Sequence, residues 1–346
     1  MKEMILFHIM GLMIGVFLDQ VIGDPHFMPH PVRAVGRLIL LLERKFLGEG
    51  DKLQQKKSGV RAVSGGRGSK RVRFQGVITW LVVVITTVTV TFGALFAAYK
   101  LNRYLGVAAE AVLTCYILAA RSLSRESMKV LRCLKRGDIE ASRYALSMIV
   151  GRDTDCLDEE GISKAAVETV AENTSDGVIA PLIYTALGGP VLGMLYKAVN
   201  TMDSMLGYRS ERYEDFGYFA ARADDAFNFV PSRFSAVMMI AGTFILQIFS
   251  NIYSGKRAFR IWRRDRLKHS SPNSAQTESA CAGALGLRLG GTHLYGGVEV
   301  FAPTIGDETR KASIDDIKRA NNLMFMTEAL TVVIILAGAF APNIIK

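Results

Sequence analysis

The sequence lacks the short motifs that mark most enzymes using nucleotides, metals or covalent intermediates. It contains no G-x-x-x-x-G-K-S/T loop, no G-x-G-x-x-G after a strand pattern and no G-x-S-x-G nucleophile motif. Its four cysteines stand singly, without a C-x-x-C pair or another metal-binding spacing, and nothing in their spacing suggests a disulfide framework. We expect reduced structural thiols, and any use of ATP requires a fold outside the standard nucleotide-binding folds.

Charged residues make up only 21 % of the 346 residues, whereas hydrophobic residues make up 50 % and gather in long runs. A helix needs roughly 20 apolar residues to cross a bilayer core. Five runs approach or reach that length, the third being marginal: Met4 to Val21, Gly76 to Tyr99, Leu105 to Ala120, Phe229 to Phe249 and Leu323 to Phe340. The sequence predicts an all-α polytopic membrane helical bundle of roughly four to six segments, as a single integral membrane domain over residues 1–346.

The first run resembles a secretory signal peptide in its position. It is longer than a typical signal-peptide core, and the segment from Asp19 to Asp24 offers no small-residue cleavage site. We expect a retained first span, with a cleaved leader as the alternative.

The net charge of +10 is concentrated in two segments, residues 48–73 and 256–268. Basic clusters beside apolar segments are typical of cytoplasmic loops and favour anionic lipid headgroups. Residues 48–73 are also rich in glycine and have no apolar period, so we expect a flexible basic loop. Nucleic-acid binding is the alternative for a basic patch, but no nucleic-acid motif accompanies these segments and no nucleic-acid partner is expected.

The pattern between the apolar runs predicts helices from Val32 to Phe46, over residues 139–150 and from Lys164 to Asn173. A polar stripe begins at Arg121, and the second and third runs form a hairpin near Asn102.

The apolar stretch from Val178 to Val199 contains two prolines and three glycines, which is typical of a broken or re-entrant segment. We expect residues 121–228, including this stretch, to form a site region on the cytoplasmic side. The positive-inside rule then leaves two alternatives: residues 229–249 do not cross fully, or residues 178–199 do cross.

Polar residues gather beside the apolar segments, where an ionisable group is costly and is therefore a functional candidate. A first group, with Asp19, Asp24, His30 and Arg33, projects from a turn fixed by glycine and proline at the end of the first run. An ordinary interfacial turn is the alternative.

A second group comprises Glu168, Glu172, Asn173 and Asp176. Glu168 and Glu172 share a helix face at i and i+4, where like charges repel unless a cation lies between them. Such oxygen ligands suit Mg²⁺ held jointly with substrate phosphates. A solvated acidic face is the alternative.

A third group follows the broken stretch: Lys197, Asn200, Ser204 and Tyr208 form a polar stripe at three- and four-residue steps, with Asp203 beside it. A lysine placed beside an Asn and an Asp is able to bind a phosphate.

In a fourth group, Asp224 and Asn228 share a helix face, Asp225 is adjacent, and Arg222 and Arg233 flank them. An Asp-Asp-x-x-Asn motif suits a clamp for Mg²⁺ and phosphate, although it is short and common.

Arginines complete the set, since Arg121, Arg152 and Arg222 are suited to bidentate contacts with phosphates or carboxylates. Carboxylates, arginines and one lysine beside a bilayer are the groups that phosphate chemistry with Mg²⁺ requires.

Longer strings that include these groups resemble one family. The strings are Gly23-Asp24-Pro25 with His30 to Arg33, Ile149 to Thr154, Val167 to Gly177 with Ala180-Pro181, Tyr196 to Tyr208, Ala221 to Asp225 with Asn228, Pro231 and Arg233, and Gly290 to Gly297. They resemble adenosylcobinamide-phosphate synthase, the CobD/CbiB family of the cobalamin pathway, over residues 15–320. The basic insertion at residues 48–73 departs from the family pattern.

The resemblance implies an ATP-dependent ligase. Such an enzyme joins the free propionate of adenosylcobyric acid to the amine of (R)-1-aminopropan-2-yl phosphate or ethanolamine phosphate. ATP is cleaved to ADP and phosphate, and the product is adenosylcobinamide phosphate. A carboxylate is a poor electrophile, so we expect an acyl phosphate intermediate that the amine attacks.

This reaction suggests roles for the candidate residues. Carboxylates that hold Mg²⁺ and the ATP phosphates would be Glu168, Glu172, Asp176, Asp224 and Asp225. Groups that bind substrate or neutralise phosphate would be His30, Arg33, Arg121, Arg152, Asn173, Asn200, Ser204, Tyr208, Arg222, Asn228 and Arg233. Lys197 would neutralise phosphate as a catalytic residue, and Asp203 or Asp24 would accept the proton of the attacking amine.

Two other function classes are alternatives. A Mg²⁺-dependent membrane prenyltransferase also uses Asp-rich helices, but it needs two such motifs facing one cavity. A membrane transporter is suggested by the broken stretch, but the other half of the sequence shows no matching break.

The expected partners are the corrinoid substrate, the amino-alcohol phosphate, membrane lipids and, through a shared bilayer, other membrane-associated nucleotide-loop assembly enzymes. The expected location is the inner (cytoplasmic) membrane, with a site facing the cytoplasm.

Overall fold

The computed structural model describes residues 2–23, 30–48, 70–207 and 212–344. The contacts within the chain divide it into two compact units that interleave along the sequence. The first unit comprises Met1–Arg121, Ala180–Phe227 and Ile335–Lys346. The second unit comprises Ser122–Ile179 and Asn228–Ile334.

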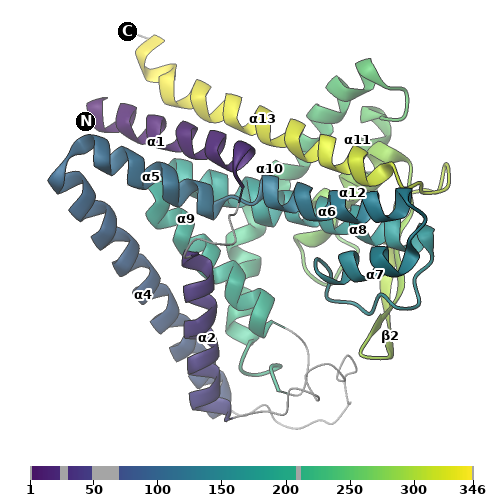
Figure 1. Ribbon diagram of the computed structural model, residues 1–346, viewed down its shortest axis with the longest axis horizontal. Coiled ribbons are helices and arrows are strands. Elements are labelled where there is room, and N and C mark those ends of the chain that lie inside the picture. Colours follow the sequence, from purple (N-terminus) through teal and green to yellow (C-terminus); the bar gives the residue numbers. More distant parts are fainter. Residues whose placement is uncertain (1, 24–29, 49–69, 208–211, 345–346) are drawn as a thin grey trace. The chain divides into compact units, whose positions relative to one another are not determined.

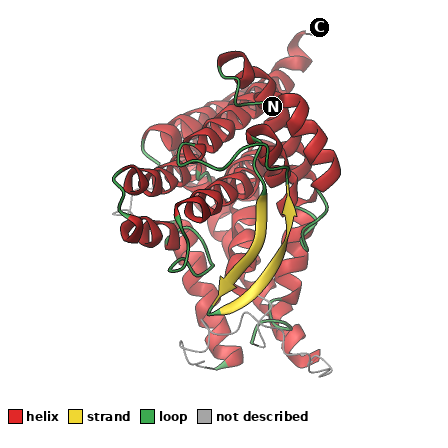
Figure 2. Cartoon of the chain, turned by 90° about the vertical axis from the view of Figure 1, so that its right-hand side faces the viewer, coloured by secondary structure: helices red, strands yellow, loops and turns green. Residues whose placement is uncertain are grey.

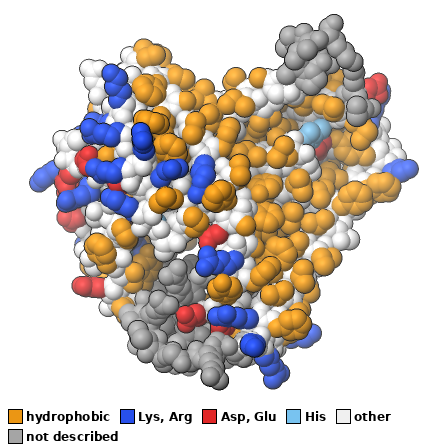
Figure 3. Space-filling model, turned by 180° about the vertical axis from the view of Figure 1, so that it is seen from behind, with side chains coloured by type: hydrophobic (Ala, Val, Ile, Leu, Met, Phe, Trp, Pro, Cys, Tyr) orange, Lys and Arg blue, Asp and Glu red, His pale blue; other side chains and the backbone are white. Residues whose placement is uncertain are grey.

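Six helical stretches among the described residues are long and apolar enough to cross a membrane, judged by length and composition. They are Glu3–Val21, Lys70–Leu101, Arg103–Lys135, Glu159–Leu206, Tyr218–Phe249 and Asp316–Phe340. Many of their large apolar side chains are exposed, and Figure 3 shows hydrophobic side chains gathered over a broad surface. Such a surface suits contact with lipid tails rather than water. The predicted polytopic helical bundle is therefore confirmed.

The first unit contains five helices and parts of two longer ones. The five are α1 (Lys2–Val21), α2 (Pro31–Leu47), α4 (Lys70–Leu101), α5 (Arg103–Ile117) and α9 (Ala180–Leu206), and the parts are the first turns of α10 (Tyr218–Phe249) and the last turns of α13 (Asp316–Ile344). Helix α1 runs alongside α5, and α4 and α9 pack on α5 and on each other (Figure 1). Asn102 accepts a hydrogen bond from the amide of Tyr104 at 2.7 Å and begins α5, which confirms the predicted hairpin.

Two glycines let α1 approach α5 closely. A Cβ atom on Gly15 would lie 2.4 Å from Cβ of Thr114, and one on Gly11 would lie 3.0 Å from Cβ of Glu110. Spaced four residues apart, the two glycines form the small-xxx-small pattern by which membrane helices gain van der Waals contact.

Helix α4 begins earlier than the sequence predicted. Residues 49–69 lie outside the described residues, but Lys70–Arg73, assigned to the flexible loop, form the first turn of α4. Arg73 donates to Asp215 at 2.8 Å and lies 4.8 Å from the ring centroid of Tyr218. Arg73 in the first turn of α4 therefore has an acidic and an aromatic partner, which a flexible loop would not provide.

Helix α9 is a helical hairpin rather than one straight helix. Its backbone leaves helical geometry at Gly188 and Gly189, where Gly189 has a φ of 64°. The two arms lie side by side, because Tyr184 stacks on Tyr196 at 5.1 Å between ring centroids. A Cβ atom on Gly193 would lie only 2.2 Å from the hydroxyl oxygen of the Thr185 side chain. The predicted break in this segment is therefore confirmed, and its re-entry into the membrane stays a prediction.

The tip of this hairpin is held by polar side chains from other helices of the first unit. His8 contacts the carbonyl oxygen of Ala186 at 3.1 Å and Oε1 of Glu110 at 2.7 Å. Tyr99 donates to Oε2 of Glu110 at 2.6 Å. Both ring nitrogens of His8 face acceptors, so both contacts are hydrogen bonds when the imidazole carries two protons. The carbonyl group that the break frees thereby gains a partner.

The second unit contains shorter helices and a strand pair. Its elements are α6 (Ala120–Lys135, from Ser122 onward), α7 (Ile139–Ser147), α8 (Glu159–Asn173), the π-helical turn η1 (Thr174–Ile179), the rest of α10, α11 (Gly255–Asp265), α12 (Ser274–Leu285), β1 (Leu289–Tyr295), β2 (Val298–Ile305) and most of α13 (Asp316–Ile344). Helix α12 packs on α8 and α11. The predicted helix over residues 139–150 ends at Ser147, and the one predicted from Lys164 begins at Glu159.

Strands β1 and β2 form an antiparallel hairpin that the sequence analysis did not predict (Figure 2). Gly296 and Gly297 connect the strands with φ angles of 59° and 80°. Positive φ at both central residues is the signature of a two-residue hairpin turn whose twist matches the strands. Among the described residues this hairpin is the one departure from an otherwise helical architecture.

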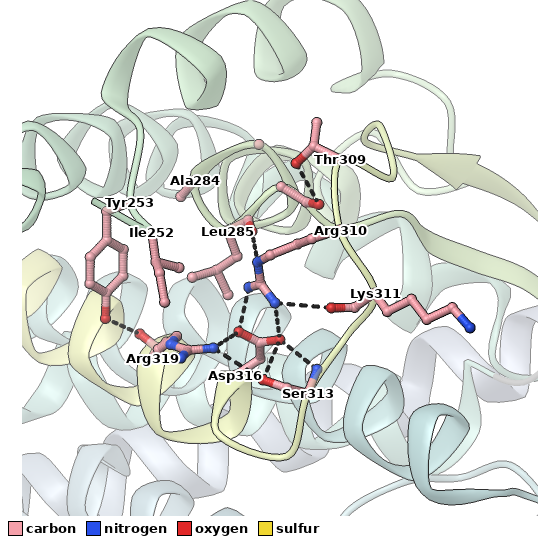
Figure 4. Close-up of polar contacts among 12 residues, drawn as sticks. Ile252, Tyr253, Ala284, Leu285, Thr309, Arg310, Lys311, Ser313, Asp316 and Arg319 are labelled. Atoms are coloured by element: carbon pink, nitrogen blue, oxygen red, sulfur yellow. Dashed lines mark hydrogen bonds and ion pairs between the residues drawn. The ribbon is translucent and has the colours of Figure 1, made fainter. Parts of the chain in front are cut away.

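A buried carboxylate fixes the start of α13 in the second unit. Figure 4 shows Asp316 between Arg310 and Arg319. The guanidinium of Arg310 donates to both carboxylate oxygens at 2.5 and 2.8 Å, and Arg319 donates at 2.7 Å. The amide of Ser313 adds a bond at 2.8 Å. Because Asp316 is fully buried, these donors compensate for the lost hydration of its charge.

Replacing Asp316 by Ala should destabilise the protein by about 3 to 5 kcal/mol, since two arginines would lose their buried partner. The matched control is Asp315→Ala, which removes a half-exposed carboxylate paired with Lys135 at 3.0 Å. That change should cost less than about 1 kcal/mol. Thermal unfolding in detergent measures both, and equal losses would show that the Asp316 network contributes little.

Replacing Gly193 by Ala should force the arms of α9 apart and cost about 1 to 3 kcal/mol. Gly93→Ala in α4 is the control, because nothing lies within 4 Å of its added Cβ. It should be neutral or slightly stabilising, since Ala is the better helix former. Equal unfolding midpoints for both variants would argue against the close contact of the arms.

Candidate functional site

One buried ion pair in the second unit joins the segment before α8 to α8, and its carboxylate also binds strand β1. The Arg152 guanidinium contacts Oε2 of Glu168, and both side chains are about nine-tenths buried. The other oxygen of Glu168 accepts a hydrogen bond from the amide of Gly290 at 2.7 Å. Both carboxylate oxygens of Glu168 therefore contact protein donors, and the ion pair fixes the Arg152 side chain.

Arg152 also contacts the ring of His293 on β1, with 2.7 Å between Nη1 and Nδ1. Since a guanidinium only donates, Nδ1 of His293 accepts and carries no proton. Burial and the positive charge of Arg152 both lower the pKa of His293, which agrees with a neutral ring. The hairpin is tied further at Asp153, whose amide donates to the carbonyl oxygen of Leu294 at 2.8 Å.

A buried carboxyl that the sequence analysis missed, that of Glu278, lies within electrostatic range of three predicted carboxylates. Glu278 on α12 is buried and interacts with the charges of Glu172, Glu168 and Asp176. Burial, and then the neighbouring negative charges, raise the pKa of Glu278 well above its ordinary value. The structure thus brings the predicted second group together with Arg152 and adds a carboxyl that favours its neutral form.

His269 accompanies Glu278, with Nδ1 3.7 Å from Oε1 of Glu278 and 3.3 Å from the hydroxyl of Ser274. Burial lowers the pKa of His269. A signal for this pair existed in the sequence: the run Gln276 to Ser279 is polar throughout, and all of it is buried within α12. Buried polar residues on all sides of a helix indicate a site or a polar network.

This donor set does not form a closed metal site by itself, and it would suit a magnesium ion only with phosphate oxygens and water as further ligands. Among the described residues, no three His, Cys, Asp or Glu side chains are grouped so that they could hold a metal. Mg²⁺ needs only one or two carboxylates when phosphates and water fill its other positions. Glu172 is exposed and Asp176 half-buried, so these two are the accessible carboxylates of the group. Asn173 donates to the carbonyl oxygen of Thr169 at 2.9 Å.

A second polar group lies in the first unit, on the returning arm of α9. The side chain of Asn200 donates to Oδ1 of the buried Asp224 at 3.3 Å. The charge of Lys197 attracts the carboxylate of Asp19, which is buried at the end of α1. The amide of Arg121 donates to Oδ2 of Asp19 at 3.4 Å. Lys197, Asn200 and Arg121 are thus associated with two buried carboxylates, those of Asp19 and Asp224.

Other predicted residues of the first unit lie nearer the surface. Arg222 is exposed and stands 3.9 Å from Oδ2 of the half-buried Asp225. Ser204 is exposed and donates to the carbonyl oxygen of Asn200 at 2.9 Å, and Asp203 is half-buried. Arg33 is exposed on α2. Asp24 and Tyr208 lie outside the described residues.

Two predicted binding residues have structural contacts. Nδ1 of His30 accepts from the amide of Val32 at 3.1 Å and so caps α2. In the second unit Arg233 donates to the carbonyl oxygen of Phe229 at 2.6 Å and lies 3.6 Å from the Phe229 ring centroid. Asn228 is fully buried. Substrate binding by these three residues stays a prediction.

Comparison with known proteins gives one consistent family. The family model described as "CobD/Cbib protein" matches residues 12–324. A "Cobalamin biosynthesis protein CobD" of Clostridium perfringens is 44 % identical over 325 residues, covering 94 % of this chain and 96 % of that one. A CobD of Listeria monocytogenes is 42 % identical, covering 90 % and 92 %. A "Cobalamin biosynthesis protein CbiB" of Salmonella choleraesuis is 43 % identical, covering 95 % and 97 %. No solved structure matches the chain.

The raised pKa of Glu278 predicts a pH-dependent stability. A carboxyl whose pKa is higher in the folded state stabilises the fold below the unfolded pKa, and this contribution is lost as pH rises through the folded pKa. Between the two pKa values the loss is about 1.4 kcal/mol per pH unit. Glu278→Gln, which cannot ionise, should therefore gain stability relative to the unaltered protein as pH rises above the ordinary pKa of a glutamate.

Thermal unfolding in metal-free detergent buffer measures this difference, and Asp265→Asn is the control. Burial opposes the charge of Asp265, but hydrogen bonds from Arg264 and Lys268 hold its pKa at about 2. A depressed pKa gives stability that is lost only as pH falls toward that value, so Asp265→Asn should cost the same throughout the tested range. Parallel curves for Glu278→Gln and the unaltered protein would contradict a neutral Glu278.

Proposed function

This chain belongs to the CobD/CbiB family, and from that membership we propose that it is an ATP-dependent ligase of cobalamin biosynthesis. It joins the free propionate of adenosylcobyric acid to the amine of (R)-1-aminopropan-2-yl phosphate or ethanolamine phosphate, giving adenosylcobinamide phosphate. The coarser role in cobalamin biosynthesis follows from relatives that align over nearly the whole chain. The structural observation that best supports the finer reaction is the group of Arg152, Glu172 and Asp176 around buried Glu168.

The proposed reaction has two steps. A propionate oxygen attacks the γ-phosphorus of ATP, the bond to the bridging oxygen breaks, and ADP leaves. The amine nitrogen then attacks the acyl carbon, inorganic phosphate leaves, and the nitrogen gives up one proton. Both steps move negative charge among phosphate oxygens, so catalysis depends mainly on positioned cations and on exclusion of water.

In the second unit the proposal gives the buried and the accessible carboxylates different roles. Glu168 holds the guanidinium of Arg152 in place, which pre-positions a fixed positive charge for a phosphate. Glu172 and Asp176 would hold Mg²⁺ together with phosphate oxygens. The bound ion would supply charge neutralisation. The neutral Glu278 limits the repulsion within the group.

In the first unit the returning arm of α9 would serve the phosphate of a substrate. Lys197 and Asn200 stand three residues apart on one helix face, and Asp224 holds the Asn200 amide. A lysine carries a compact charge suited to a phosphate, and the amide adds a directional donor. Asp225 and Arg222 remain proposed phosphate and metal contacts, and Asp203 or Asp24 the proton acceptor.

We place the site on the cytoplasmic side of the cell membrane. Because the two arms of α9 lie side by side, residues 178–199 would enter the membrane and return to the same side. The positive-inside rule then favours the alternative in which residues 229–249 do not cross fully, because the basic segments 48–73 and 256–268 would otherwise lie on opposite sides.

The ligase is tested by incubating the purified protein with adenosylcobyric acid, MgATP and aminopropanol phosphate, with mass-spectrometric detection of the amide. Product that requires all three components supports the proposal. Absence of product from folded protein in both detergent and bilayers would refute it and call for a prenyl-diphosphate screen.

Replacing Glu172 by Ala should lower kcat/KM for MgATP by about 100-fold and raise the Mg²⁺ concentration needed for half-maximal rate, because a charge-stabilising ligand is lost. Glu159→Ala is the matched control, an exposed carboxylate in the first turn of the same helix. It should keep full activity. Full activity of Glu172→Ala would remove Glu172 from the metal proposal.

A further inference from the structure

Helix α11 carries an exposed stripe on which basic and large apolar side chains alternate. The stripe consists of Lys256, Phe259, Arg260 and Arg263, with Leu267 in the turn that follows the helix. All five are exposed, Phe259 by 48 % and Leu267 by 63 %. Their spacing of three or four residues places them on one face. Exposing two large apolar side chains among cations is unfavourable in water, which indicates that something else covers this face.

The cations of this stripe are mostly not engaged with acidic side chains. Arg260 lies 3.5 Å from Asp307, at the weak end of ion-pair distances. Within the part of the chain that the structure describes, neither Lys256 nor Arg263 has an acidic partner within ion-pair distance. The stripe therefore presents positive charge outward, and its complement is an anionic surface.

The opposite face of α11 is fixed to the second unit, so the stripe cannot turn inward. Ala258 and Ile261 are fully buried. Nε and Nη2 of Arg257 donate to the carbonyl oxygens of Gly283 and Ala284 at 2.6 and 3.0 Å, which binds α11 to the end of α12.

The start of α11 lies against the end of an apolar helix. The amide of Gly255 donates to the side chain of Gln247 in the last turns of α10 at 2.9 Å. In that same turn Ile248 and Phe249 are 76 % and 80 % exposed, an exposure that suits lipid contact. The end of α10 and the start of α11 therefore lie next to each other, beside an apolar surface that a bilayer would cover.

We propose that the α11 stripe docks on anionic lipid headgroups, with Phe259 and Leu267 inserted at the boundary of the acyl chains. Alternating cations and large apolar side chains on one face are typical of helices that lie in the membrane interface. Lys256, Arg260 and Arg263 bind the headgroup phosphates, and their long stems extend along the apolar boundary. The basic segment near residue 260 is thus a folded interfacial helix with a defined lipid-facing side.

The test uses tryptophan fluorescence in nanodiscs that contain lipids brominated on the acyl chains. Trp80→Phe leaves Trp262 as the background, and Leu267→Trp adds a reporter on the stripe, away from the ring contact of Phe259 with Trp262. The quenching of interest is the difference between these two proteins. It should rise with the fraction of anionic lipid and fall with added salt.

The charge dependence is measured in the same reporter protein. Each cation near an anionic surface adds about fivefold to docking, so Lys256→Glu with Arg263→Glu should weaken it by at least about 25-fold. Lys311→Glu, an exposed cation elsewhere in the second unit, is the control and should leave quenching unchanged. Unfolding midpoints should be unaltered, because all these side chains are exposed.

Three outcomes would overturn the proposal. Absence of reporter quenching in every lipid would show that the stripe faces water. Equal quenching in neutral and anionic nanodiscs would show apolar contact without headgroup recognition. A blue-shifted, unquenched reporter whose emission depends on protein concentration would identify a second copy of the chain as the occupant. None of these measurements requires enzymatic activity, so failure here leaves the proposed ligase untouched.

Discussion

The second unit depends on carboxylates that are buried among apolar helices, where a charge is tolerated only with donors close by. Glu168 takes its donors from the segment before α8 and from β1, so one side chain fixes both. Asp316 joins the start of α13 to the segment that precedes it. In both cases the partners come from separate elements, and compensating the charge is what sets the positions of those elements.

In the first unit, a buried carboxylate is compensated by partners that carry fewer charges. Glu110 contacts His8 and Tyr99, and the histidine in turn reaches the carbonyl group freed at the tip of α9. Close packing of α1 on α5, allowed by Gly11 and Gly15, brings these groups within reach. The close packing of α1 on α5 and the polar contacts of His8 are therefore coupled. Without Gly11 and Gly15, the carbonyl group of Ala186 at the tip of α9 would lose His8 as its partner.

Much of the fold could be predicted because it depends on local composition. Apolar runs marked the membrane helices, and the Gly188 to Pro190 string marked the break in α9. The β hairpin was missed, because Gly290 to Gly297 is poor in strand-forming residues and its register is fixed by contacts with Glu168 and Asp153. Glu278 and His269 were missed for a related reason. They lie about a hundred residues from Glu168, and their burial follows from the packing of α12 on α8.

The interleaving of the two units has a consequence for biogenesis. Residues 122–179 are synthesised before the first unit receives Ala180–Phe227, and Ile335–Lys346 of that unit emerges only after the second unit is complete. Neither unit corresponds to one continuous stretch of nascent chain, so vectorial domain-by-domain folding is not open to this protein. Glu110 meets its partners His8 and Tyr99 as soon as α5 has been made, because both precede it in the chain. The contact of His8 with the carbonyl oxygen of Ala186 forms only later, after residues 122–179 of the second unit have been synthesised.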